Sequence, residues 1–272
     1  MSLHAAKKLS DNPTDQQKTD YSPVLVNLEA VHKVYQTGTI ALHDVNLQIT
    51  QGEFISFVGP SGCGKSTVLR MIAGLGEPSS GKLEVLGTTA KRAREENNEV
   101  AFVFQDATLL PWRSVLDNVV LPLELRGVPK QDQQREAMRV LEMVGLKDHV
   151  KALPRQLSGG MKMRVSIARA LAAKPKLLLM DEPFAALDEI TRQNLQNELL
   201  NIWKQEGLTV LFVTHNVFEA VFLSTRIAVM TPRPGKIATM IDVPMPYPRK
   251  ETLRTTHQFS DIAAEVSSAL VH

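Results

Sequence analysis

The chain has 272 residues, 43% of them hydrophobic, and its 31 lysines and arginines nearly balance its 29 aspartates and glutamates, for a formal net charge of +2. This length suits one large domain or two small ones, and the hydrophobic fraction excludes wholesale disorder. The balance of charge argues against a dedicated nucleic-acid-binding protein, which carries a clear basic excess.

The single cysteine, Cys63, rules out an internal disulfide and fits a reducing cytosol. No run approaches the ~18 consecutive apolar residues that a membrane-spanning helix requires. Residues 1–22 are rich in Lys, Asp, Asn, Gln, Ser and Thr and lack the apolar segment of a signal peptide, so they predict a disordered tail. Any association with a membrane is therefore expected to come through a partner.

Short β-branched and aromatic runs dominate the first part of the chain after this tail. The run at 54–58 is apolar along its length and stops at a glycine, which is typical of a buried strand, and a helical pattern follows at 65–73. We expect strands at residues 24–28, 45–49, 54–58, 82–86 and 100–104.

A mostly helical block follows these strands. Residues 113–126 and 131–144 show helical spacing, and the second stretch carries an apolar stripe. We expect an inserted helical subdomain at about 106–157. From Ser158 onward helices and strands alternate again, with strand-like runs at 177–180, 208–213 and 227–230.

This alternation predicts an α/β fold in which helices flank a mixed sheet with a parallel core. A proline-rich segment at 232–248 marks a loop or the edge of the sheet. The main domain is expected to span 23–246, followed by a C-terminal extension at 247–272 that contains a short helix at 262–270.

Residues 59–66 fit the P-loop pattern GxxxxGK[ST] at every fixed position, directly after a buried strand and directly before a helix. Glycines let backbone N–H groups turn toward phosphate oxygens, and the helix N-terminus adds favourable dipole charge. Lys65 is expected at the β- and γ-phosphates and the Ser66 hydroxyl at Mg²⁺. The residues expected at the nucleotide are Gly59, Pro60, Ser61, Gly62, Cys63, Gly64, Lys65, Ser66 and Thr67.

Cys63 lies inside this loop and allows two interpretations. A regulatory thiol is conceivable next to so much positive backbone potential. The favoured interpretation is a variable loop position that tolerates a small side chain.

Two adjacent carboxylates, Asp181 and Glu182, end the apolar run at 177–180. Because successive side chains of a strand point to opposite faces, one acid can face Mg²⁺ while the other faces the attacking water. Asp181 suits the metal and Glu182 suits the general base. Taken alone, the pair could instead be acids at the start of a helix that begins at Pro183.

A second helix N-terminus with exposed backbone donors is predicted at Ser158, Gly159 and Gly160. Such a helix end can bind another anion, yet one ATP occupies only the P-loop. Two chains arranged head to tail would satisfy both sites, each clamping the γ-phosphate held by the other.

With the segment Leu157–Met161, the chain resembles the ABC transporter ATPase family, whose signature reads LSGGQ. The resemblance covers residues 26–243 and implies a P-loop NTPase core with an N-terminal antiparallel β subdomain. It also implies that Tyr35 stacks on adenine, that Gln105 contacts Mg²⁺ and the attacking water, that Asp188 crosses the dimer interface and that His215 lies at the γ-phosphate. Taken singly, Tyr35 or His215 would more often be an ordinary structural residue.

The signature departs from the family at Met161, which stands where the family has glutamine. The ligand contacts belong mainly to the Ser158 hydroxyl and the glycine backbone, so activity is expected to survive. A hydrogen bond from the family glutamine has no counterpart here.

The segments Gln105–Trp112, Asp181–Asp188 and Met230–Gly235 are similar to the nitrate, sulfonate and taurine importer branch of this family. The resemblance implies that the helical block receives a helix from a membrane-embedded permease, in a groove that Leu109, Leu110 and Trp112 could line. The alternative is that Trp112 belongs to the packed core of the subdomain.

The resemblance as a whole implies an ATP- and Mg²⁺-dependent motor at the cytoplasmic face of the membrane, acting with a second ATPase subunit and permease subunits, and indirectly with a solute-binding protein. No nucleic acid is expected as a partner. A non-transport ABC ATPase of translation or DNA maintenance is the alternative. It is disfavoured because the chain has one P-loop, no heptad run and little net charge.

Overall fold

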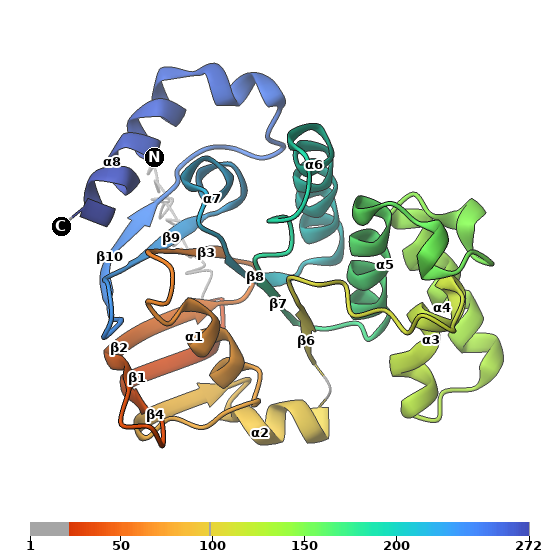
Figure 1. The fold of residues 1–272 in the computed structure, drawn as a ribbon, viewed down its shortest axis with the longest axis horizontal. Helices are drawn as coiled ribbons and strands as arrows, with labels where there is room; N and C mark the ends of the chain where they lie inside the picture. The colour runs from red at the N-terminus through yellow and green to blue at the C-terminus, as the bar shows by residue number, and fades with distance from the viewer. Residues whose placement is uncertain (1–21, 98, 272) are drawn as a thin grey trace, which may run out of the picture.

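Two β-sheets lie one above the other with helix α1 (Lys65–Ile72) between them, as Figure 1 shows for this computed structural model. The structure describes residues 22–97 and 99–271, so the tail predicted at 1–22 lies, except for Ser22, outside the described residues. Within the described residues one sheet has four strands and the other has six.

The smaller sheet is antiparallel and has the strand order β2-β1-β4-β5. This confirms the antiparallel β unit that the resemblance implied. The first strand runs well beyond the predicted residue 28, because shifts in register and a positive φ of 46° at Ala30 interrupt its polar–apolar alternation. The strands are β1 (Val24–Val34), β2 (Ile40–Thr50), β4 (Ser80–Val85) and β5 (Thr88–Thr89), of which β5 was not predicted.

The larger sheet is mixed, as predicted, with the strand order β10-β9-β3-β8-β7-β6. All neighbouring pairs are parallel except β10 with β9, so the proline-rich segment supplies an antiparallel edge strand. Its strands are β3 (Phe54–Val58), β6 (Val100–Val103), β7 (Leu177–Asp181), β8 (Thr209–Val213), β9 (Arg226–Met230) and β10 (Ile237–Asp242).

Each face of the mixed sheet is covered by a hydrophobic core, which explains why its central strands are apolar along their whole length. In β7, Leu177 and Leu179 pack toward α1 and the antiparallel sheet, whereas Leu178 and Met180 pack toward the opposite face. A strand buried on both faces needs no polar alternation.

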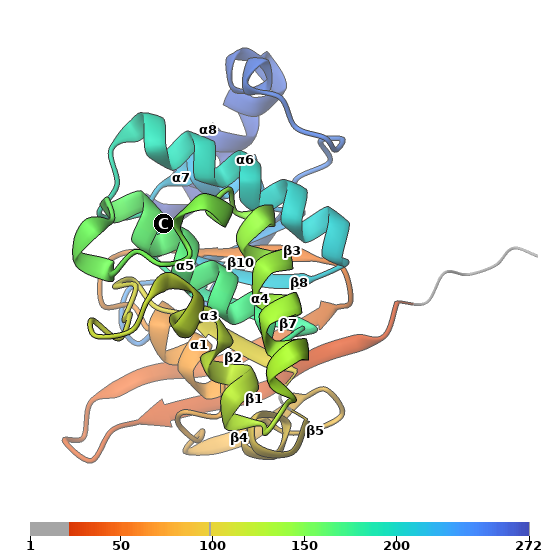
Figure 2. The ribbon, with the colours of Figure 1, turned by 90° about the vertical axis from the view of Figure 1, so that its right-hand side faces the viewer.

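The opposite face of the mixed sheet carries the longer helices, and the helical block projects to one side (Figures 1 and 2). Helix α6 is capped at its start by Asp188, whose side chain accepts a hydrogen bond from Thr191 N, and at its end by the left-handed Gly207. The helices of this half are α3 (Val115–Leu125), α4 (Lys130–Met143), α5 (Gly159–Ala172), α6 (Glu189–Glu206), α7 (Val217–Leu223) and α8 (His257–Val271).

Short helical turns complete the chain. A turn of α-helix, α2, and the π-helix after it were not predicted, because so short a stretch has no periodicity to detect. These turns are α2 (Ala90–Arg92), η1 (Ala93–Asn97), η2 (Lys147–His149), η3 (Pro154–Gln156) and η4 (Glu251–Thr255).

The C-terminal extension packs against the mixed sheet through α8, which begins five residues before the predicted start at Ile262. Phe259, Ile262 and Val266 bury its inner face. The buried Arg249 donates to the carbonyl oxygens of Val221 and Phe222 and so caps the end of α7. Among the helices at 22–97 and 99–271, none has the length and apolar character needed to cross a membrane.

Candidate nucleotide-binding site

Four parallel strands, β3, β8, β7 and β6, end at the same edge of the mixed sheet. The P-loop follows β3, the acid pair follows β7, and His215 and Gln105 follow β8 and β6. In open α/β sheets the ligand binds in the crevice at the carboxyl ends of the strands. Residues that are far apart in the sequence are therefore gathered at one edge.

The P-loop turns tightly from β3 into α1. Gly64 caps the helix with φ at 108°, and a Cβ on this residue would lie 2.5 Å from Leu42 Cδ2. Lys65 is only 5% exposed, and its Nζ donates to Gly59 O at 2.8 Å and to Pro60 O at 3.0 Å. These two bonds hold the ammonium group inside the curve of the loop.

Cys63 is a packing residue in this loop. It is 1% exposed, and a Cβ placed on Gly59 would come within 2.8 Å of its Sγ. A thiol that is closed off from solvent disfavours the interpretation as a regulatory cysteine.

The two side chains predicted at Mg²⁺, Ser66 and Asp181, lie in contact with each other. Ser66 Oγ donates to Asp181 Oδ1 at 2.7 Å. Burial raises the pKa of the Asp181 carboxyl, and the hydrogen bond from Ser66 opposes that shift. Within the described ranges no group of three His, Cys, Asp or Glu side chains could hold a metal ion. The pair still fits Mg²⁺, which keeps several waters and takes one or two protein oxygens beside substrate phosphates.

Glu182 is held in an uncommon backbone conformation, with φ at 46°. Its N–H donates to Val213 O at 3.0 Å, which fixes it to the end of β8. Its Oε2 lies 3.3 Å from Nδ1 of His215, whose side chain is 65% exposed. The structure therefore places the predicted base beside the predicted γ-phosphate residue.

A cavity of about 260 Å³ opens over the P-loop. Tyr35 stands at its rim, and its hydroxyl lies 3.1 Å from Thr67 Oγ1. The cavity is lined by Tyr35, Ala41, Ser61, Gly62, Gly64, Lys65, Ser66, Thr67, Glu182 and Arg233.

Gln105 is not among the described residues that line this cavity. It is exposed, two residues beyond the end of β6. It lies at the common edge of the sheet, and its predicted contact with Mg²⁺ and the attacking water stays a prediction.

Ser158, Gly159 and Gly160 lie at the start of α5, and they too are absent from the described lining of the P-loop cavity. Ser158 Oγ accepts from Met161 N at 3.2 Å, so the hydroxyl proton remains available to a ligand. A Cβ on Gly160 would lie 2.6 Å from Thr191 Cγ2, whereas Gly159 has room for one. A side chain at Gly160 would therefore force Thr191 to move, whereas one at Gly159 would not.

Asp188 caps α6 through a 2.9 Å hydrogen bond from Thr191 N to its Oδ1. This bond from the Thr191 backbone lowers the pKa of the Asp188 carboxyl. The side chain therefore has a structural task in its own chain, besides the interface role that the resemblance implies. Met161 packs partly against the hydrophobic core.

Two residues of the described cavity lining, Ala41 and Arg233, were not assigned to the nucleotide by the sequence analysis, and of these only Arg233 has a polar side chain. Its Nε and Nη2 both donate to Gly62 O, at 3.2 and 3.1 Å. In the same loop a Cβ on Gly235 would lie 1.8 Å from Cys63 O, so only glycine fits against the P-loop. The segment after β9 was noted only for its resemblance, because the sequence does not show that β9 lies beside β3.

The family model described as ABC transporter matches residues 42–185, more than half of the chain. The chain belongs to the ABC transporter family. Consistent with this family, it is an ATP-binding subunit and an ATPase whose reaction is coupled to transport.

Curated relatives cover most of this ABC subunit. It is 47% identical over 239 residues to an uncharacterized ABC transporter ATP-binding protein of Methanocaldococcus jannaschii, covering 87% of this chain and 88% of the relative. It is 41% identical over 244 residues to the aliphatic sulfonates import ATP-binding protein SsuB of Bacillus cereus, covering 89% and 94%.

Solved structures agree with the ABC fold. The dimeric post-hydrolysis state of the ATP-binding cassette MJ0796, bound to ADP and Pi, has a TM-score of 0.72 and 33% identity, covering 81% of this chain and 100% of that one. CbiO1 from Clostridium perfringens, part of the ABC transporter complex cbiONQ, has a TM-score of 0.76 and 25% identity, covering 90% and 99%.

Proposed function

We propose that this subunit is the motor of an importer for a small anion or a related organic compound, with aliphatic sulfonates as the first candidate cargo. The observation that carries the proposal is the 41% identity to a protein named for aliphatic sulfonate import. Nitrate and taurine are the related cargoes that the sequence segments favour.

The test is growth of a deletion strain on one aliphatic sulfonate as the sole sulfur source, with inorganic sulfate as the control. Loss of growth on the sulfonate alone, restored by the intact gene but not by a Glu182→Gln copy, supports the proposal. Normal growth of the deletion strain on sulfonates, together with loss of uptake of nitrate or another solute, contradicts sulfonate as the cargo. The conclusion that the subunit is a transport ATPase is unaffected by that result.

The side chains at the sheet edge divide the work of ATP hydrolysis. Lys65 neutralises charge at the β- and γ-phosphates, and Tyr35 stacks on adenine. Glu182 takes a proton from the attacking water, and His215 binds the γ-phosphate beside it. Gln105 would contact the metal and the attacking water, as the resemblance implies.

Bound Mg²⁺ would supply positive charge to offset the negative charge that develops during phosphoryl transfer. Ser66 and Asp181 are the residues that would hold it. Asp181→Asn is expected to raise the Mg²⁺ concentration at half-maximal ATPase activity by about 10- to 100-fold. The amide oxygen can still accept from Ser66 Oγ, so the folded state is retained. An Mg²⁺ titration checks this, and an unchanged midpoint would remove Asp181 from the metal site.

Arg233 adds a further cation at the nucleotide. Two of its donors hold Gly62 O, and its charge lies beside the phosphate cradle. Arg233→Ala is expected to raise KM for ATP by about 5-fold, which corresponds to roughly 1 kcal/mol of binding. Lys236→Ala, in the same loop but outside the cavity lining, is the matched control. Equal KM values for the two variants would contradict the assignment.

The proposed motor works as a dimer. The P-loop cavity and the helix end at Ser158 are separate sites on one chain, and a head-to-tail partner would bring them together over the γ-phosphate. A dimeric cassette among the similar structures supports this arrangement. Asp188 would then lie at the interface between the two subunits.

The helical block is the proposed docking surface for a permease. Trp112 is 73% exposed, so its interpretation as packed core is wrong. A groove of about 670 Å³, lined by Phe102, Leu121 and Leu125 among others, lies where the block meets β6. The residues predicted to line the permease groove, Leu109, Leu110 and Trp112, are not among its described lining residues. An amphipathic helix of a membrane subunit fits such a groove. This contact would hold the motor at the cytoplasmic face of the membrane, below an external solute-binding protein.

A further inference from the structure

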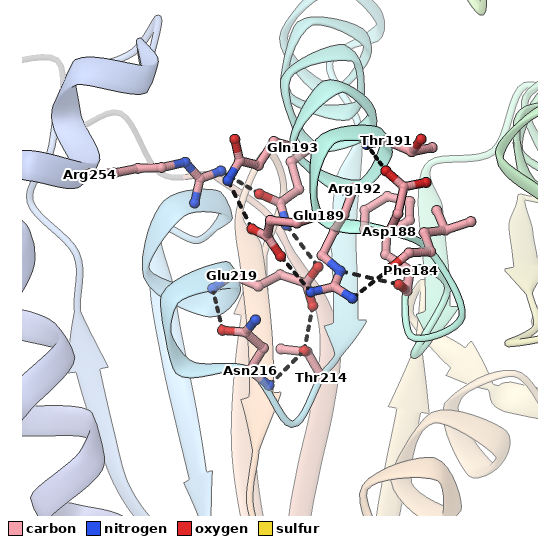
Figure 3. A network of polar contacts seen from close by, with 12 residues as sticks. Phe184, Asp188, Glu189, Thr191, Arg192, Gln193, Thr214, Asn216, Glu219 and Arg254 are labelled. Atoms are coloured by element: carbon pink, nitrogen blue, oxygen red, sulfur yellow. Dashed lines mark hydrogen bonds and ion pairs between the residues drawn. The ribbon is translucent and has the colours of Figure 1, made fainter.

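A buried carboxylate lies one layer behind the site. Glu219, on α7, is only 5% exposed. Its carboxylate accepts from Thr214 Oγ1 and, at 2.9 Å, from Gln196 Nε2 (Figure 3). Burial raises its pKa, whereas these two hydrogen bonds oppose that shift. Removing an acid from water is costly unless its bonding is complete, so these contacts define a built polar cluster.

The cluster holds the backbone on both sides of His215. Thr214 Oγ1, besides donating to Glu219, accepts from Asn216 N at 3.0 Å. Asn216 Oδ1 accepts from Glu219 N at 3.2 Å, which closes a ring of contacts around the histidine. Because the His215 side chain is 65% exposed, little packing of its own restrains it. Its position therefore depends on this backbone.

The same helix that supplies Gln196 also holds the loop after Glu182. Arg192, one turn earlier on α6, donates to Leu187 O at 2.8 Å and to Phe184 O at 3.3 Å. Gln196 Oε1 in turn accepts from Arg254 of the C-terminal extension. Figure 3 shows these contacts running from the extension through α6 to the loops at the sheet edge.

A cavity of about 20 Å³, enough for a single water molecule, lies between Glu182, His215 and Glu219. Glu182 and His215 on one side and the buried cluster around Glu219 on the other thus enclose one small cavity. A displacement of the Thr214 hydroxyl would move the histidine relative to Glu182.

We propose that Glu219, acting through Thr214, is a positioning residue that holds His215 at the distance from Glu182 that ATP hydrolysis requires. This inference rests on the proposed role of His215. Misplacing a catalytic group by about 1 Å can cost on the order of 10²-fold in rate.

The experiment compares two valine substitutions in the same segment of chain. Thr214→Val removes the hydroxyl but keeps the shape, and is expected to lower kcat by about 10- to 100-fold with KM for ATP unchanged within about 2-fold. Thr214→Ser restores the hydroxyl and is expected to recover most of kcat. The matched control is Thr209→Val at the far end of β8, where the buried hydroxyl accepts from Gly52 N at 2.9 Å. That variant is expected to lose stability and keep kcat.

A double-mutant cycle separates positioning from general damage. In the His215→Ala background, Thr214→Val is expected to cause no further loss of kcat, because its effect passes through the histidine. A second, equal loss in that background overturns the inference, as does wild-type kcat in Thr214→Val. If Thr214→Val does not fold, Asn216→Ala tests the same inference, because it removes the hydrogen bond from Glu219 N to Asn216 Oδ1. If His215→Ala itself keeps wild-type kcat, the proposed role of the histidine fails instead.

Discussion

Glu182→Gln is expected to lower kcat for ATP hydrolysis by about 10²- to 10⁴-fold, the usual contribution of a general base. The amide is nearly the same size as the carboxylate but cannot accept a proton from water. The backbone at this position is held by the bond from Glu182 N to Val213 O, which the substitution leaves in place. The loss should therefore be chemical, and steady-state phosphate release measures it directly.

ATP binding should persist in this variant, because Lys65 and the P-loop are unchanged. With ATP bound and not hydrolysed, the proposed dimer should accumulate, and light scattering or size-exclusion chromatography would detect it. Glu265→Gln, on the exposed face of α8, controls for the loss of one charge. Turnover near the wild-type rate in Glu182→Gln would exclude this residue as the base.

Ser158→Arg is the substitution with the second largest expected effect, a loss of turnover of about 10²-fold or more. The arginine side chain would obstruct the composite site, in which the P-loop of one subunit faces Ser158 of the other. Because Ser158 does not line the P-loop cavity of its own chain, ATP binding by the separate subunit should be unchanged. Lys65→Ala should also lose turnover, but for a different reason, because it loses ATP binding by the separate subunit. Fluorescent-nucleotide binding and phosphate release distinguish the two.

Mixing these two inactive variants should restore turnover. In a head-to-tail dimer that contains one copy of each, one site combines an intact P-loop with an intact Ser158, while the other site carries both defects. Ser114→Arg is the matched control, since Ser114 caps α3 with the same bond to a backbone N–H, at 3.1 Å from Asp117 N. Full activity of Ser158→Arg at any dilution would contradict the composite site.

Local patterns predicted a large part of the fold. The strand at 54–58, the P-loop and the helix after it lie where the sequence placed them, because each depends on residues adjacent in the chain. The predicted start of α8 was late and β5 was missed, since short or weakly periodic elements are stabilised by distant contacts rather than by their own pattern.

The residues of the site likewise divide into those that local motifs identify and those that depend on distant contacts. Lys65, Ser66 and Glu182 were identified from motifs, and the structure brings them to one cavity. Arg233 could not be identified in that way, because its contact with Gly62 crosses 171 positions of the chain. Glu219 was missed for a related reason. Its bond to Thr214 is short in sequence, but its other partner, Gln196, lies on α6, which the sequence does not show to be its neighbour.

The sequence by itself determined the phosphate-binding loop, the acid pair and the family, because glycine, lysine and carboxylate at fixed spacing are requirements of local backbone geometry and phosphate chemistry. Only the tertiary structure decided which strand ends are neighbours, and hence that Arg233 braces the P-loop and that a buried acid stands behind His215. Strand order is set by how apolar faces pack across the whole chain, and no local spacing records it.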